Sequence, residues 1–142
     1  MTLRLALCCG ATLLAGAARA DLCHEIDALD TSPNPITLGL AYNDQAPVCT
    51  RSLLLGGGTQ LHCGWVFPYR AAAANVAFQH LLNTVARCLG DKAHATPDPD
   101  VNHPDFYDLH TFRLGEREVG VSLKDKAARA ETHIFLRIVF PR

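Results

Sequence analysis

The sequence predicts an α+β fold in which one long helix packs on an antiparallel sheet of about five to six strands. Residues 70–89 contain no Gly or Pro and have the apolar spacing of an amphipathic helix. Short segments on both sides of this stretch alternate apolar and polar residues, as strands with one buried face do. The chain is long enough for one such domain with a core of its own.

The first twenty residues have the features of a secretory signal peptide. Arg4 gives a basic start, an apolar run follows, and Ala18-Arg19-Ala20 matches a cleavage site. The apolar run is shorter than the ~20 residues of a membrane helix. We therefore expect a single domain over residues 21–142, exported to the periplasm or the medium. The bias toward arginine, with ten against three lysines, favours a bacterial source with a GC-rich genome.

The charge of the expected mature chain argues against nucleic-acid binding. The whole chain has 13 basic and 14 acidic residues. Removal of Arg4 and Arg19 with the signal peptide leaves a net charge of 11 − 14 = −3. A mildly acidic chain without a basic stripe is a poor partner for a polyanion.

Four cysteines follow the expected cleavage site, and an even number in an exported chain predicts two disulfides. Three pairings are possible. We expect Cys23–Cys49 and Cys63–Cys88, because closing loops between neighbouring cysteines costs the least entropy. A redox or zinc site is disfavoured because no C-x-x-C motif is present.

Four segments precede the long helix. They are, in order, a helical turn over residues 25–29, a strand over 37–42, a strand or short helix over 48–55 and a strand over 61–67. In the last of these, Cys63, Trp65 and Phe67 share one face because strand side chains alternate. The glycines before it predict a turn, because the Gly-Lys-Ser/Thr of a phosphate-binding loop is missing.

The helix has a stripe of ~120° that predicts its buried side. Its members are Ala74, Phe78, Leu81, Leu82, Val85, Cys88 and Leu89. His80 falls opposite this stripe, so we expect it to be a solvated surface residue. Val76 is the one apolar exception on that side.

The C-terminal third predicts a β-meander. Gly115-Glu116 suits a two-residue hairpin turn, which places Phe112 opposite Val119 and His110 opposite Val121. The predicted core face contains Val119, Val121, Leu123, Ile134, Leu136 and Ile138. Residues 124–130 are expected to connect the last two strands.

The stretch DPDVNHPDFYDLH, residues 98–110, concentrates the polar groups of the chain, with four aspartates, one asparagine and two histidines. Asp98, Asp100 and Asn102 match the first ligand positions of an EF-hand calcium loop, but the Gly and Glu of that loop are missing. A solvent-exposed polar loop over residues 91–109 is therefore favoured, and ion binding there stays open.

A transition-metal site is a second hypothesis, with the candidate ligands His103, Asp105, Asp108 and His110. Glu131 and His133 fall at the same end of the predicted sheet. In the predicted register, however, His110 points to the buried face and His133 to the opposite one. The sequence thus predicts no metal site and no cofactor, and instead a buried His110 hydrogen-bonded to Asp108.

The same residues also supply the parts of an acid/base enzyme. A carboxylate–histidine pair can be drawn from His103, Asp105 or Asp108. None of the serines lies in a G-x-S-x-G motif. The two lysines Lys124 and Lys126 form a charged run that suits either a solvated turn or a binding edge for a carboxylate or phosphate.

These observations favour a small secreted or periplasmic protein of binding or inhibitor type, which docks on another protein through the loop over residues 91–109. The expected binding residues are His103, Asp105, Asp108, His110, Lys124 and Lys126. The alternative is a metal-assisted or acid/base hydrolase that uses the cluster over residues 98–110. A protein partner is expected, and neither a nucleic acid nor a membrane.

Overall fold

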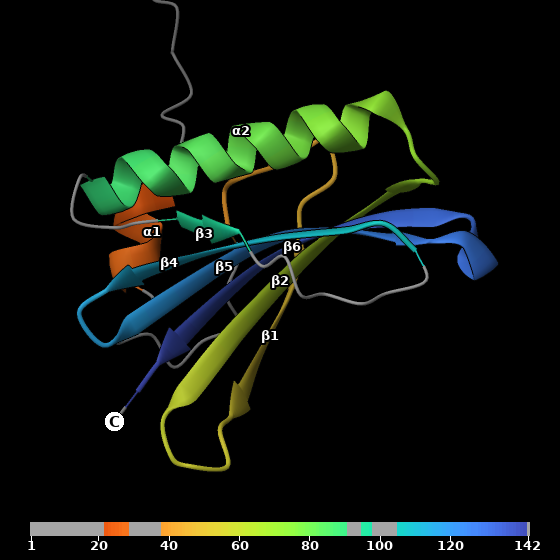
Figure 1. Cartoon of the computed structure of the whole chain (residues 1–142). Helices are drawn as coiled ribbons and strands as arrows, with labels where there is room; N and C mark the ends of the chain where they lie inside the picture. The colour runs from red at the N-terminus through yellow and green to blue at the C-terminus, as the bar shows by residue number, and fades with distance from the viewer. Residues whose placement is uncertain (1–21, 29–37, 91–94, 98–104, 142) are drawn as a thin grey trace, which may run out of the picture.

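Two helices lie on one side of a twisted antiparallel sheet (Figure 1). The structure, a computed structural model, describes residues 22–28, 38–90, 95–97 and 105–141, so the expected signal peptide lies outside the described residues. The elements are α1 (Leu22–Ala28), β1 (Val48–Leu53), β2 (Thr59–Pro68), α2 (Ala72–Leu89), β3 (Ala95–Pro97), β4 (Tyr107–Leu114), β5 (Arg117–Lys126), a 3₁₀ turn (Ala127–Arg129) and β6 (Glu131–Phe140). The six strands have the order β1-β2-β6-β5-β4-β3. The predicted α+β fold is confirmed.

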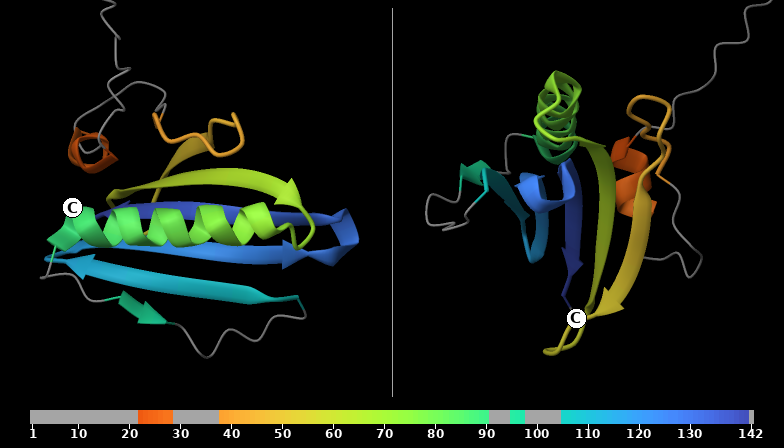
Figure 2. Two further views of the ribbon diagram at one scale, coloured as in Figure 1. Left: turned by 90° about the horizontal axis from the view of Figure 1, so that it is seen from above. Right: turned by 90° about the vertical axis from the view of Figure 1, so that its right-hand side faces the viewer.

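The long helix α2 lies lengthwise over the middle of the sheet and contacts β4, β5 and β6 (Figure 2). It begins at Ala72, two residues later than predicted, because Arg70 lies in the turn before it with a positive φ of 54°. It ends at Leu89 and is followed by Gly90, whose φ of 66° suits a residue without a Cβ. The predicted buried stripe is confirmed, although Leu82 and Cys88 are only half-buried.

The C-terminal hairpin has the predicted register. Gly115 takes a positive φ of 60° in the turn, and Phe112 pairs with Val119 and His110 with Val121. Because side chains alternate along a strand, this register decides which ones face α2. The buried side chains of the meander include Phe112, Val119, Val121, Leu123, Ile134, Leu136 and Ile138.

The strand predicted over residues 37–42 is wrong for its described part, residues 38–42. Apart from one isolated bridge, this part makes no strand pairing. Leu38 is buried in the core, and the indole Nε1 of Trp65 donates a hydrogen bond of 3.3 Å to the carbonyl of Leu40. Tertiary contacts therefore hold this segment where a strand ladder was expected.

Two connections predicted from polar composition contain strand residues. Lys124 and Lys126 belong to β5, because they pair with His133 and Glu131 of β6. The loop expected over residues 91–109 contains β3 and the start of β4. In both places strand pairing prevails over a polar sequence, since residues on the solvent side of a sheet are free to be polar.

Cys23, Cys49, Cys63 and Cys88 all form disulfides, as predicted, but the predicted pairing is wrong. The bridges are Cys23–Cys88 and Cys49–Cys63. The second joins two residues that lie directly opposite each other on β1 and β2, and the first joins α1 to the last turn of α2. Loop entropy separates the two pairings by only about 0.3 kcal/mol, so the register of β1 and β2 decides. Two disulfides are typical of an oxidising compartment, and we conclude that the protein is extracytoplasmic.

Candidate functional site

The sequence-predicted binding residues do not form one site in the described structure. Asp108 and His110 lie on the face of β4 that α2 covers, whereas Lys124 and Lys126 point to the opposite face of β5. The alternation of side chains along paired strands causes this separation. His103 lies outside the described residues.

Two carboxylate–histidine pairs occur, one on each side of the sheet. Nε2 of His110 lies 3.1 Å from Oδ1 of Asp108, and its ring lies 6.0 Å from that of Phe78 on α2. On the other side, Nε2 of His133 lies 2.8 Å from Oε2 of Glu131. The predicted contact within the first pair and the separation of the two pairs are confirmed, but the His110 side chain is 20% exposed and therefore not buried as predicted. Within the described ranges, no three His, Cys, Asp or Glu side chains gather closely enough to hold a metal ion.

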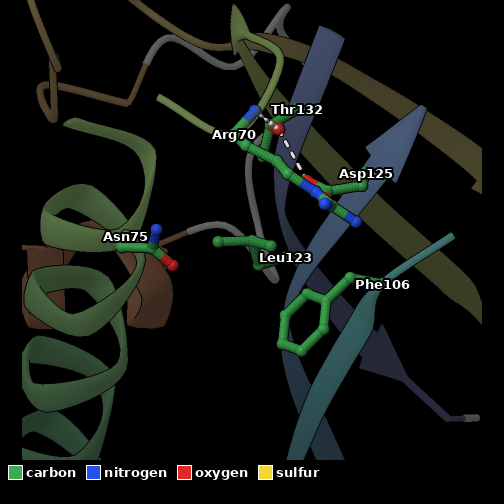
Figure 3. A pocket seen from close by; sticks show the side chains of 6 residues that line it. All are labelled: Arg70, Asn75, Phe106, Leu123, Asp125 and Thr132. Atoms are coloured by element: carbon green, nitrogen blue, oxygen red, sulfur yellow. Dashed lines mark hydrogen bonds and ion pairs between the residues drawn. The ribbon is translucent and has the colours of Figure 1, made fainter. Parts of the chain in front are cut away.

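A buried carboxylate fastens the turn between β2 and α2 to the ends of β5 and β6 (Figure 3). Asp125, whose side chain is 4% exposed, accepts hydrogen bonds from Nε of Arg70 at 2.9 Å and from the Thr132 hydroxyl at 2.6 Å. The same hydroxyl accepts the backbone N–H of Arg70 at 2.8 Å. These bonds hold Arg70 in its positive-φ conformation, where a residue with a Cβ is strained.

A cavity of about 250 Å³ adjoins this cluster and is lined by Arg70, Asn75, Phe106, Leu123, Asp125 and Thr132. The hydrogen bond to Asp125 is the main cause that raises the pKa of Arg70, and the charge of Asp105 adds to it. The negative charge of Asp105, a predicted binding residue, also acts to raise the pKa of Lys124. Asp105 thus lies close to both Arg70 and Lys124. The guanidinium is already engaged, so we interpret the cluster as a structural lock.

Asp125→Ala is expected to lower the free energy of unfolding by about 2 kcal/mol, because it removes two hydrogen bonds from a buried site. Urea unfolding measures this effect. Arg129→Ala is the matched control, because Arg129 belongs to an exposed ion pair with Glu131, and it should cost about 0.5 kcal/mol or less. Equal effects of the two substitutions would contradict the lock.

The side of the sheet opposite α2, here called the open face, carries no helix among the described residues (Figures 1 and 2). The register places on it alternate residues of the four long strands, including His62, Gly64 and Val66 of β2, Tyr107 and Leu109 of β4, Gly120, Ser122 and Lys124 of β5, and His133, Phe135 and Arg137 of β6. Most of the larger side chains in this set are half-buried rather than fully exposed. The open face is therefore partly apolar and bears several basic groups.

A groove of about 310 Å³ lies in the middle of the open face. Its lining residues are His62, Tyr107, Leu109, Gly120, Ser122, Lys124, Phe135 and Arg137. Gly120 and Ser122 belong to β5, which lies between β4 and β6 in the sheet. Gly120, which has no side chain, and the small Ser122 make the floor, and the larger residues of the flanking strands make the walls.

Glycine in β2 explains how the Phe135 ring is accommodated beside this groove. A Cβ on Gly64 would lie 3.1 Å from two ring carbons of Phe135, so the ring covers Gly64 closely. The ring of His62 packs against the same phenyl ring, with centroids 4.7 Å apart. The Phe135 ring of β6 thus packs onto β2. On its other side Phe135 pairs with Ser122 of β5, whose side chain is only a hydroxymethyl group.

Two basic groups of the groove, His62 and Lys124, are partly desolvated. Burial lowers the pKa of His62, and the positive charge of Arg137 lowers it further. Burial also lowers the pKa of Lys124, and the neighbouring Lys126 contributes to this lowering. Nζ of Lys124 lies 5.3 Å from the centroid of the Tyr107 ring, a cation–π contact. The groove thus combines aromatic walls with basic groups.

Sequence reasoning missed most of the residues of this groove. Lys124 was a candidate, but His62, Tyr107 and Arg137 were not. A signal was available, because the alternation of side chains along a strand already placed His62 on the face of the strand that points away from the side chain of Cys63. The order of the strands, which brings β2 next to β6, was needed to see that these residues are neighbours.

A larger groove, about 1020 Å³, lies between α2 and the segment over residues 39–43. The phenol oxygen of Tyr42 lies 3.1 Å from Nδ1 of His80, and the Tyr42 ring also packs edge-on against Trp65. Burial raises the pKa of Tyr42, because the phenolate is poorly solvated there. His80 is exposed, as predicted, but it also anchors Tyr42.

Two further observations bear on the class of protein. Within the described part of the chain, neither helix combines the length and the apolar character that crossing a membrane requires. Comparisons with protein-family models, with curated proteins and with solved structures found no match to this chain. The function therefore has to be inferred from the residues of the chain itself.

Proposed function

We propose that this protein is a small periplasmic or secreted protein of binding or inhibitor type, which docks on another protein through the open face of its sheet. One observation carries the proposal: aromatic and basic side chains, most of them half-buried, surround a groove on the open face. Interface centres are enriched in aromatic residues and arginine. The signal-peptide features of residues 1–20 and the two disulfides support export.

The pairing of the strand at the floor of the groove also supports docking. This strand is β5, which pairs with β4 on one side and with β6 on the other. On the reverse side of these strands, Val121 and Leu136 are fully buried under α2. A surface that is already ordered loses little entropy on binding, so more of the contact energy appears as affinity.

A second candidate function is acid/base hydrolysis by the polar cluster over residues 98–110. The contact of 3.1 Å between Asp108 and His110 favours it, because a carboxylate that orients a histidine is a common acid/base arrangement. His110→Gln should then abolish a hydrolytic activity while it leaves the fold intact. Docking through the open face should be unaffected by this substitution, because His110 lies on the other side of the sheet.

Two exposed valines provide a matched test of the docking face. Val66 is 44% exposed on the open face, and Val76 is 70% exposed on α2. The mature protein is immobilised and exposed to a periplasmic extract. The Val76→Asp variant should still capture the partner, whereas the Val66→Asp variant should not. An aspartate on a docking surface introduces a charge that has to be desolvated, which weakens binding.

Thermal unfolding should show that both valine variants fold like the wild type. Retention of the same partner by both variants would contradict docking through the open face. Loss of the partner only in Val76→Asp would transfer the docking site to the groove beside α2, because Val76 lines that groove.

A further inference from the structure

We infer that the groove on the open face seats a carboxylate from an acidic, partly apolar segment of the partner protein. This inference rests on the proposed docking function and specifies the chemistry of the partner. It follows from the charge of the open face, from the groups that line the groove and from the size of the groove.

The open face is basic although the chain as a whole is slightly acidic. The charged strand residues that the register places there are Arg113, Lys124, Lys126 and Arg137 against Glu118 and Glu131. These residues give 4 − 2 = +2, compared with a net charge of −1 for the whole chain. Complementary potentials guide two proteins toward each other and determine their orientation, so an acidic partner surface suits this face.

The lining of the groove has basic groups and no acidic ones. His62, Lys124 and Arg137 line it, together with the hydroxyl group of Ser122 on the floor. Lys124 lies beside Lys126, whose charge opposes its protonation. A carboxylate in the groove would add to the attraction that Asp105 already exerts on Lys124, and it would accept charge-assisted hydrogen bonds, which are stronger than neutral ones.

The guanidinium of Arg137 is oriented before any ligand arrives. Its Nη2 donates a hydrogen bond to Glu118, which lies outside the groove lining. The Glu118 carboxylate also limits the negative charge of a ligand that binds beside Arg137. It repels a phosphate dianion more strongly than it repels a single carboxylate. The pairing therefore favours a monoanion over a phosphate group.

The walls of the groove add a requirement for apolar surface next to the acid. Tyr107, Leu109 and Phe135 line it, and its volume of about 310 Å³ is that of a small binding pocket. Because β5 is paired on both sides, a partner cannot add a strand at the floor of the groove. The partner therefore has to insert side chains into the groove. A glutamate next to a phenylalanine supplies a carboxylate for the basic groups and an apolar ring for the walls.

Defined peptides test this inference. The probe is acetyl-Gly-Glu-Phe-Glu-Gly-amide, and its counterpart has Gln in place of both Glu residues. In ¹⁵N NMR titrations of the mature protein, the Glu peptide should shift the amide signals of Gly120 and Ser122. The Gln peptide should bind about tenfold more weakly or worse, because it lacks the charge-assisted hydrogen bonds.

Three variants show where the peptide binds. Lys124→Gln should weaken the Glu peptide about tenfold, whereas Arg87→Gln, the same charge change on α2, should leave its affinity unaltered. Gly120→Ala should weaken it without harm to the fold, because the added Cβ would meet its nearest neighbour, a Leu109 methyl carbon, at 3.7 Å. The methyl group would occupy the floor of the groove.

Several results would overturn the inference. Equal binding of the Gln peptide would exclude a carboxylate seat. An equal loss of affinity in Lys124→Gln and Arg87→Gln would show non-specific charge attraction. Benzoate that binds as tightly as the peptide would point to a free small carboxylate as the ligand. If the peptide fails while Val66→Asp still abolishes capture of the partner, the docking proposal stands and only the carboxylate seat is refuted.

Discussion

Replacing both Cys23 and Cys88 by alanine is expected to lower the free energy of unfolding by about 4 kcal/mol. The bridge closes a loop with a sequence separation of 65 residues, and a cross-link restricts the unfolded chain more when the loop is longer. It also joins α1 to the end of α2, so the buried Leu22 and Ile26 of α1 depend on it for their position. A loss of this size is a large part of the stability of a typical domain, about 5–15 kcal/mol.

The second disulfide is the internal control for this prediction. Cys49–Cys63 closes a separation of only 14 residues, so its removal should cost less, about 3 kcal/mol. Urea unfolding of both double variants measures the difference. A larger loss for the Cys49 and Cys63 variant would contradict the loop-length argument. Peptide mapping under non-reducing conditions should recover both bridges, and peptides that join Cys23 to Cys49 would contradict the pairing itself.

Phe112→Ala is expected to cost about 3–5 kcal/mol, as deletion of a buried aromatic ring does. Phe112 is 2% exposed and lies opposite the fully buried Val119, on the side of the sheet that α2 covers. Truncation to a methyl group leaves a cavity between the helix and the sheet that the packed neighbours fill only in part.

The next residue along β4 provides the control for Phe112. The side chain of Arg113 is 80% exposed on the open face, so Arg113→Ala should cost about 0.5 kcal/mol or less. Denaturant unfolding of the two variants therefore reports the register directly. Similar losses for both would mean that the hairpin is shifted by one residue, which would exchange the faces of β4.

The most predictable parts of this protein depend on local chemistry. The periodicity of residues 70–89 determines α2, and Gly115-Glu116 determines the hairpin turn. The turn then sets the register of the whole β4–β5 pair, because strand pairing propagates from it. For this reason the contact between Asp108 and His110, and its separation from His133 by the sheet, were also predictable.

The parts that were not predictable depend on small differences in free energy or on contacts between residues far apart in the sequence. The two disulfide pairings differ by about 0.3 kcal/mol in loop entropy, so the opposition of Cys49 and Cys63 on paired strands decides between them. The segment over residues 38–42 resembles a strand in composition. It is held instead by the buried Leu38 and by a hydrogen bond from Trp65, both of which require the finished core.

By itself the sequence determined the elements whose signal lies within a few residues, and the faces of strands whose turn it specifies. Only the tertiary structure decided which of those faces meet. Strand order brought His62 of β2, Phe135 of β6 and Lys124 of β5 around one groove. The physical reason is that neighbours in a sheet are selected by burial of the whole apolar face, a sum over residues far apart in the chain.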